Sequence, residues 1–444
     1  MPVTHPSQRV AYPYFVVALL LFVLQVLMGT TVWASERSPG AFRLRTRGDD
    51  RDPGAPLGEL TCRSLVIATG AHDRQLPFPG WDLPGVMTAG AAQALVKGSG
   101  VAPGRRVVVA GTGPFLLAVA ATLLRAGVRV VAVVEAADPR PAAMAGLLPD
   151  LARGWTKAGE LGHYLALLAR ERVAYLLGHR VVRAHGGPDP APGTTALTGV
   201  TIARTDHRGR PRTGTERDLA CDVLATGLGF TAALDLPLQL GCPVIRGADG
   251  GLAVGVDRVQ RTGVPGVLAA GETTGVGGAE LALLEGLLAG AAAAGGLGFA
   301  PSVPAARLRH WQRRIGGLRR FAAGLHRAFP VPEGWPDGLE DATVVCRCEE
   351  VNVGQVRDAV HELGATDPRT VKLLTRAGMG WCQGRVCGFA VERLCPPGPT
   401  DQPPAARAAA GSARPLTVPV GLGALAATVG HSDASTATEE EPPR

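Results

Sequence analysis

The chain has 444 residues, which at roughly 150 residues per domain is enough for about three domains. Hydrophobic residues make up 46% and charged residues 19%, a composition that supports packed cores and excludes a collagen-like or disordered chain. The net charge of +7 comes almost entirely from arginines that are scattered along the chain, so we expect no nucleic-acid partner.

An uncharged apolar run from Val10 to Ser35 is long enough to cross a bilayer. More arginines follow this run than precede it, which places the remaining chain in the cytoplasm. We therefore predict a transmembrane helix within residues 1–36, and membrane association through residues 10–35. Two alternatives stay open: a secretory signal peptide, and a start site or gene fusion that joined a foreign segment to this protein.

Buried strands, glycine turns and helices alternate between residues 61 and 300. The predicted strands are residues 61–70, 106–110, 128–135, 221–227 and 266–272, and the predicted helices are residues 116–126, most of 141–180, and a segment that ends at Gly290. The first strand ends in Ala-Thr-Gly, and residues 225–227 repeat that turn.

Residues 111–116 form a glycine loop between a predicted strand and a predicted helix. Gly111 allows a tight turn, and Gly113 lets the backbone approach a pyrophosphate at the helix N-terminus. Glu135 ends the next strand, where a carboxylate accepts hydrogen bonds from a ribose 2′-hydroxyl and repels a 2′-phosphate. The loop thus predicts a dinucleotide fold and favours NAD over NADP, with a fold that keeps the loop but no ligand as the alternative.

Residues 305–329 are predicted to form an amphipathic helix with one apolar face. Its other face is rich in arginine, which indicates either a solvated surface or a docking surface for an acidic partner. A linker is expected at residues 330–341.

Two close cysteine pairs, Cys346-x-Cys348 and Cys382-x4-Cys387, lie near the C-terminus. Four thiolates in two pairs suit either a tetrahedral zinc ion or a [2Fe–2S] cluster. A fifth cysteine, Cys395, is expected to be packed rather than ligating.

The surroundings of these cysteines favour the cluster over zinc. Backbone amides in the glycine-rich loop can donate hydrogen bonds to sulfur, and Arg347, Arg376 and Arg385 can offset negative charge. Asn352 and Gln355 match a capping box that starts one helix of this module, and Asp367-Pro368 can start a second.

Several motifs together resemble the FAD/NAD oxidoreductases with two dinucleotide folds. They are residues 65–74 and 77–87, the run from Gly271 to Glu280, and the cysteine module. More narrowly, the chain resembles the α subunits of opine oxidase, hydrogen cyanide synthase and D-hydroxyproline dehydrogenase. The cysteine module resembles the [2Fe–2S] domain of bacterioferritin-associated ferredoxin.

The resemblance implies an α/β fold of the glutathione-reductase type, with one dinucleotide-binding domain nested in another, followed by a small α-rich [2Fe–2S] domain. It implies FAD near Ala68, Thr69, Gly70, Gly271 and Glu272, a [2Fe–2S] cluster on Cys346, Cys348, Cys382 and Cys387, and NAD at Gly111, Gly113 and Glu135. Family members begin with a glycine-rich loop for the FAD pyrophosphate. No such loop precedes residue 111, so we expect an FAD-binding fold that is truncated at its N-terminus and has lost its main phosphate contacts.

The expected domains follow in chain order. They are the membrane helix at 1–36, an incomplete FAD-binding-like domain at 37–100 and 220–300, an NAD-binding-like domain at 101–219, a helical linker at 301–341, the [2Fe–2S] domain at 342–397 and a disordered tail at 398–444.

The leading functional hypothesis is a redox subunit of a flavin-dependent amino- or imino-acid dehydrogenase. It would pass electrons from FAD to the cluster beside a β subunit that bears the substrate-oxidising flavin site. The alternatives are a non-catalytic protein that keeps only an iron–sulfur relay or interaction module, and a membrane-tethered NAD-dependent reductase without FAD. No catalytic residue is assigned, since His72, Asp73 and Arg74 can face a ligand or simply stabilise a turn.

Overall fold

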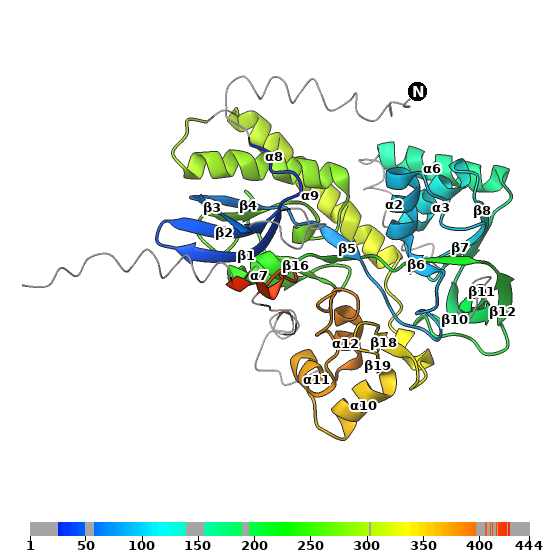
Figure 1. The fold of residues 1–444 in the computed structure, drawn as a ribbon. Helices are drawn as coiled ribbons and strands as arrows, with labels where there is room; N and C mark the ends of the chain where they lie inside the picture. The colour runs from blue at the N-terminus through cyan, green and yellow to red at the C-terminus, as the bar shows by residue number, and fades with distance from the viewer. Residues whose placement is uncertain are drawn as a thin grey trace, which may run out of the picture.

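The computed structural model describes residues 25–48, 57–138, 155–188, 195–301, 303–396 and scattered positions between 405 and 426. It confirms a mixed α/β fold. Two larger parts lie next to each other, and a small helical module lies against both of them (Figure 1).

The first larger part, here called the NAD-like half, is built on a five-stranded parallel sheet with the order β6-β13-β7-β8-β9. These strands are β6 (Val86–Thr88), β13 (Val223–Gly227), β7 (Arg106–Gly111), β8 (Arg129–Glu135) and β9 (Ala174–Leu177). The sequence-based domain boundaries are therefore wrong here, because β6, helix α2 (Ala89–Ser99) and β13 belong to this half and not to the FAD-binding-like domain.

Both faces of this sheet are covered. Val107 and Val109 pack toward helices α2, α3 (Phe115–Arg125) and α6 (Trp155–Arg170). The alternate residues Val108 and Ala110 pack toward an antiparallel sheet. That sheet is formed by β10 (His179–Pro188), β11 (Thr195–Arg204) and β12 (Arg217–Ala220).

The second larger part, here called the flavin-like half, contains strands β1–β5 and β14–β17 with helices α7 (Asp235–Gln239) and α8 (Ala279–Gly296). Its parallel core is short, because β4 (Leu65–Ile67) pairs only with β17 (Val267–Ala269). The antiparallel strands are β1 (Thr31–Ser38), β2 (Ala41–Arg47) and β3 (Leu57–Cys62) in one sheet, β5 (Ala71–Asp73) with β14 (Phe230–Ala232), and β15 (Val244–Arg246) with β16 (Leu252–Val254).

Strand β1 corrects the predicted extent of the membrane helix. Its residues Trp33 and Ala34 are buried in the flavin-like half, so residues 31–36 are not part of a helix that spans a membrane. Residues 1–24 of that prediction lie outside the described residues. Among the described helices, α8 (Ala279–Gly296) has the length and apolar composition of a membrane span, but it packs on α9 (Ala305–Ala328), β4 and β17.

Helix α9 (Ala305–Ala328) confirms the predicted amphipathic helix, with Ile315 and Leu318 packed against α8. Its arginine face is partly engaged within the protein. Arg314 pairs with Glu280, and Arg319 pairs with Glu285. In Figure 1, α9 runs from α8 toward the NAD-like half.

The third part, here called the cysteine module, comprises β18 (Val344–Cys346), β19 (Val351–Asn352), α10 (Val353–His361), α11 (Pro368–Thr375) and α12 (Gly388–Leu394). Both predicted helix starts are confirmed. Asn352 and Gln355 form a reciprocal capping box on α10, and Asp367 caps α11 before Pro368. The predicted linker at residues 330–341 also contributes to the module, because Trp335 in the 3₁₀ helix η3 (Trp335–Gly338) is buried in its core.

Part of the C-terminal tail is ordered, which corrects the prediction of a disordered segment from residue 398. Thr417 donates hydrogen bonds from its backbone amide to the Trp33 carbonyl at 2.8 Å and from its hydroxyl to the Val32 carbonyl at 2.7 Å. Arg47 donates to the Pro419 carbonyl at 3.1 Å. The tail therefore packs along β1 and β2.

Candidate functional site

The four predicted ligand cysteines come from two places in the module. Cys346 ends β18, and Cys348 follows in the turn before β19. Cys382 and Cys387 lie in the loop between α11 and α12, with Cys387 directly before α12. Cys346 and Cys387 are buried, Cys382 is half-buried, and Cys348 is exposed, so the site has one solvent-facing edge.

The four thiols meet in two pairs. The thiol of Cys387 donates a hydrogen bond to the Cys346 sulfur, which lowers the pKa of Cys346, and backbone amides including that of Gly378 act in the same direction. Cys348 and Cys382 form the second contact. Thiolate is the form that binds metal, so this environment prepares Cys346 as a ligand.

Four cysteine thiols in two contacting pairs fit a [2Fe–2S] cluster, which takes its four thiolates on two irons. Cys395 packs at the edge of the module core, as predicted.

The loop between α11 and α12, residues 376–387, is here called the cysteine loop, and its glycines keep this site compact. A Cβ on Gly380 would lie 2.2 Å from the Cβ of Cys348, and a Cβ on Gly378 would lie 3.9 Å from the Cys387 sulfur. A larger residue at position 380 would therefore displace the loop from Cys348.

The predicted flavin-site residues lie together at the carboxyl ends of β4 and β17. Ala68, Thr69 and Gly70 follow β4, and Gly271 and Glu272 follow β17. The hydroxyls of Thr69 and Thr273 are 2.8 Å apart, which fixes the two turns side by side. The carboxyl ends of parallel strands are the usual ligand-binding edge of such a sheet.

Sequence reasoning missed the carboxylate that holds this edge. Glu285 in α8 is fully buried and accepts hydrogen bonds from the Gly271 amide at 2.9 Å and the Thr274 hydroxyl at 3.0 Å. Arg319 compensates its charge with an ion pair of 2.6 Å. The sequence indicates Glu285 only as an acidic residue in the middle of an apolar helix.

The described residues fit only part of an FAD site. They supply the strand-end turns, but among them no glycine-rich strand–loop–helix precedes β4, and the antiparallel strands β1–β3 come first. The FAD pyrophosphate therefore has no backbone loop within this part of the chain.

The NAD-like loop is closed. Both oxygens of Glu135 accept backbone hydrogen bonds, from the Gly113 amide at 2.8 Å and the Ala137 amide at 2.9 Å, and its side chain is 0% exposed. A Cβ on Gly113 would lie 4.0 Å from the Cβ of Phe329 at the end of α9. Two of the predicted NAD contacts, the Glu135 carboxylate and the backbone of Gly113, are therefore hydrogen-bonded to each other in this arrangement.

The segment from His72 to Arg74 stabilises the contact between the flavin-like half and the module. The His72 ring lies 3.0 Å from the Arg385 carbonyl oxygen, and Asp73 accepts a hydrogen bond from Thr88 at 2.6 Å. Arg74 is buried, forms an ion pair of 2.6 Å with Asp249, and stacks on the ring of Phe389 in α12 at 4.2 Å. Of the two roles considered for these three residues, ligand contact and local stabilisation, the second fits these contacts.

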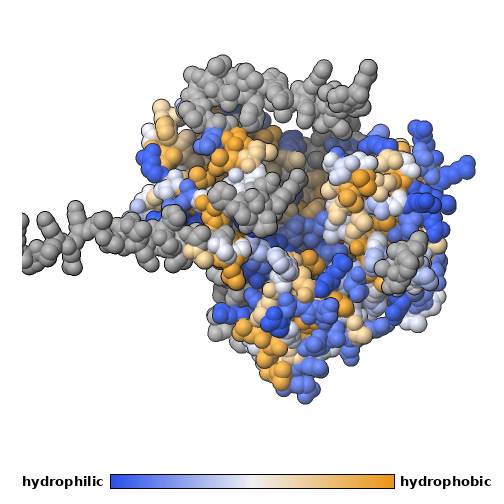
Figure 2. Space-filling view, in the orientation of Figure 1, coloured by the Kyte–Doolittle hydropathy of each residue, from blue (hydrophilic) through white to orange (hydrophobic). Residues whose placement is uncertain are grey.

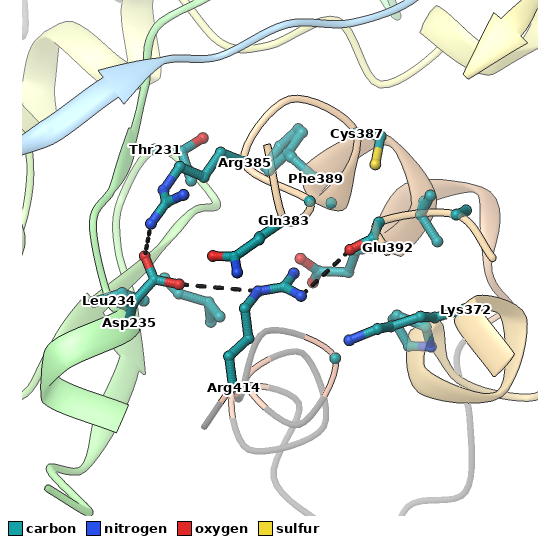
Figure 3. A pocket seen from close by; sticks show the side chains of 18 of the residues that line it. Thr231, Leu234, Asp235, Lys372, Gln383, Arg385, Cys387, Phe389, Glu392 and Arg414 are labelled. Carbon is teal, nitrogen blue, oxygen red and sulfur yellow. Dashed lines mark hydrogen bonds and ion pairs between the residues drawn. The ribbon is translucent and has the colours of Figure 1, made fainter. Parts of the chain in front are cut away.

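A pocket of about 870 Å³, including its solvent-open part, lies between the flavin-like half and the cysteine module. Figure 3 shows Asp235 on one side, Cys387, Phe389 and Lys372 on the other, and Arg385 and Arg414 between them. The pocket therefore connects the flavin-like half to one of the predicted cluster ligands.

Two dinucleotide folds followed by a four-cysteine module define a class of redox proteins, the flavin- and nicotinamide-linked oxidoreductases with an iron–sulfur domain. Comparison with known families agrees. Residues 22–294 match the pyridine nucleotide-disulphide oxidoreductases, and residues 344–395 match the BFD-like [2Fe–2S] binding domain. The chain belongs to the pyridine nucleotide-disulphide oxidoreductase family.

Two curated relatives are subunits of larger enzymes. Hydrogen cyanide synthase subunit HcnB from Pseudomonas aeruginosa is 34% identical over 346 residues, which cover 77% of this chain and 72% of that protein. An opine oxidase subunit from Agrobacterium tumefaciens is 31% identical over 343 residues, which cover 74% of this chain and 63% of that protein.

The fold is also similar to a solved structure, L-proline dehydrogenase from P. horikoshii. The TM-score is 0.58 at 21% identity, and the match covers 89% of this chain and 64% of that one. Together the two matched families imply FAD/NAD(P) binding and a [2Fe–2S] cluster. The protein is thus a flavin oxidoreductase subunit with a [2Fe–2S] domain.

Proposed function

We propose that this chain is the redox subunit of a flavin-dependent amino- or imino-acid dehydrogenase and that it carries electrons from FAD to its [2Fe–2S] cluster. The observation that carries the proposal is the direct contact between the flavin-like half and the cysteine module. Arg385 from the cysteine loop pairs with Asp235 at 3.0 Å, and Arg246 pairs with Glu392 of α12 at 2.6 Å. Such contacts hold a cluster at a fixed distance from a flavin.

The cofactors would supply the chemistry, because flavin accepts hydride and the cluster carries single electrons. The protein would hold and orient them. Cys346, Cys348, Cys382 and Cys387 would bind the cluster. The turns after β4 and β17 would border the flavin, with Glu285 fixing the Gly271 amide.

A partner protein is part of the proposal, and the surface of the module supports it. Leu373 and Trp381 are 64% and 82% exposed, and Leu363, Leu374 and Met379 are also exposed. Figure 2 shows apolar surface on the module at its end away from the two halves. Clustered apolar side chains near the exposed Cys348 are typical of a protein-binding surface. The partner would bear the flavin site that oxidises the substrate.

The proposal is tested on the full chain purified without oxygen. We expect two irons and two acid-labile sulfides per chain, flavin absorbance, and bleaching of the visible spectrum by an amino or imino acid when the partner protein is present. Zinc in place of iron would contradict the cluster assignment.

The absence of a glycine-rich loop before β4 among the described residues favours one alternative, a protein that keeps only an iron–sulfur relay or interaction module. Iron without flavin, unchanged by added FAD, would support this alternative and contradict the leading proposal. The cytoplasmic location and the membrane anchor stay predictions, because residues 1–24 lie outside the described residues.

A further inference from the structure

The three arginines that the sequence suggested as charge partners of the cluster have other contacts. Arg347 stacks on the ring of Trp81 at 5.2 Å, Arg376 pairs with Glu349 at 2.8 Å, and Arg385 pairs with Asp235. Each of these three arginines therefore has a partner other than the cysteines.

Two other cations lie beside the cysteine loop, and the sequence did not indicate either of them. Lys372 on α11 and Arg414 in the tail both line the pocket that contains Cys387 (Figure 3). Among the described residues, the side-chain amine of Lys372 forms no ion pair or hydrogen bond, although its backbone carbonyl accepts one from Arg376 within α11. Burial, followed by repulsion from Arg414 and Arg369, lowers the pKa of Lys372, and attraction to Cys387 opposes this.

Arg414 lies directly on the backbone of the cysteine loop. Its guanidinium donates a hydrogen bond to the Gly378 carbonyl at 3.3 Å, and a Cβ on Gly384 would lie only 2.7 Å from one of its nitrogens. The absence of a side chain at Gly384 therefore leaves the space that Arg414 occupies. The guanidinium also lies 3.9 Å from Asp235, but that carboxylate already pairs with Arg385.

The described tail residues Arg414 and 416–419, here called the strap, are hydrogen-bonded to the rest of the protein on both sides of the Arg414 side chain. Two hydrogen bonds from Thr417 tie the strap to β1, and Arg385 donates one to the Thr417 carbonyl. The side-chain amide of Gln239 in helix α7 (Asp235–Gln239) donates to the Arg414 carbonyl at 3.5 Å. The strap thus connects the flavin-like half to the cysteine loop and presents a cation between them.

The pocket beside Cys387 is lined by three cations, Lys372, Arg385 and Arg414, and by two carboxylates, Asp235 and Glu392. Asp235 pairs with Arg385, and Glu392 pairs with Arg246 from the flavin-like half. The [2Fe–2S] cluster gains one electron and one negative charge on reduction, with no bond made or broken. Fixed positive charge in a half-buried site stabilises the reduced form more than the oxidised form.

Resting on the proposed role of the cysteines as cluster ligands, we propose that Lys372 and Arg414 are positioning residues that raise the reduction potential of the [2Fe–2S] cluster, and that the strap delivers Arg414 for this purpose. The cluster thereby becomes the more favourable acceptor for electrons that arrive from the flavin.

The test is an anaerobic redox titration of the full chain with dithionite and mediators, followed by the electron paramagnetic resonance signal of the reduced cluster. The variants are Lys372→Gln, Arg414→Gln and Arg414→Lys. The matched control is Arg357→Gln on α10, which removes the same charge from an exposed pair with Asp341. Iron content and circular dichroism establish that each variant keeps its cluster and fold.

We expect each Gln variant to lower the ratio of reduced to oxidised cluster at a fixed potential on the order of tenfold, equal to about 59 mV for one electron. Arg414→Lys should keep most of the original potential because it keeps the charge. Shifts no larger than that of Arg357→Gln in both Gln variants would overturn the inference. If Arg414→Gln loses its cluster, the result for Lys372→Gln decides alone, since the side chain of Lys372 forms no ion pair or hydrogen bond among the described residues. A chain that binds zinc or no metal in every form would instead contradict the proposed function.

Discussion

Glu135 allows a sharp test of the closed loop in the NAD-like half. Burial raises the pKa of its carboxyl from an ordinary 4.5 to about 7, against the opposing effect of the amides of Ala137 and Gly113. The folded protein therefore binds more protons than the unfolded chain between these two pH values. The contribution of the Glu135 carboxyl to the free energy of unfolding is fully present below about pH 4.5 and is lost as the pH rises through about 7.

The size of this effect follows from the two pKa values. At about 1.36 kcal/mol per pKa unit, the rise from 4.5 to about 7 corresponds to about 3 kcal/mol in total. About 2 kcal/mol of that loss falls between pH 5.5 and pH 8.0. Glu135→Gln has nearly the same volume and no charge, so its stability should lack this component.

The assay is urea unfolding of the full chain and of Glu135→Gln at both pH values, followed by tryptophan fluorescence. The variant also loses one acceptor for a backbone amide, which costs about 1–3 kcal/mol at both pH values. The decisive quantity is therefore the difference between the variant's ΔΔG at pH 5.5 and at pH 8.0. If that difference is close to zero, Glu135 does not carry the buried charge that the structure gives it.

Three further predictions concern single residues. Cys387→Ser should abolish iron binding while Cys395→Ser keeps it, and equal iron content in both would refute the assigned ligands. Gly111→Ala should destabilise the NAD-like half by about 3 kcal/mol, because its Cβ would lie 1.8 Å from the Gly227 carbonyl oxygen, and an unchanged urea midpoint would be inconsistent with that contact. Asn352→Ala should cost about 1 kcal/mol by removing the cap of α10, seen as earlier thermal loss of the cluster absorbance, whereas Asn352→Asp should retain the cap.

The sequence predicted those parts of the molecule that depend on local patterns. The strands and helix around the glycine loop, the two caps in the cysteine module and the amphipathic α9 follow from periodicity and capping residues. The gathering of the four cysteines could be inferred because their spacing is typical of one kind of site.

Features that depend on tertiary packing could not be predicted in this way. Residues 225–227 have the same Ala-Thr-Gly letters as the turn after β4, yet they are the last residues of strand β13, which pairs with β6 and β7 in the other half. Gly111 is predicted to allow a tight turn, but the sequence does not show that the backbone of Gly227 lies directly beside it. Arg414 lies in a segment whose composition indicates disorder, and only its contacts with the cysteine loop show that it is positioned.

The pairing of β4 with β17 has a consequence for the order in which the protein folds during synthesis. Leu65 and Val267 are partners in this ladder, and the residues of the NAD-like half lie between them in the chain. During translation the NAD-like half can therefore fold first, while β4 stays unpaired until β17 has been synthesised. The exposed β4 edge is vulnerable to aggregation during that interval, so a chaperone that covers it should increase the yield of soluble protein.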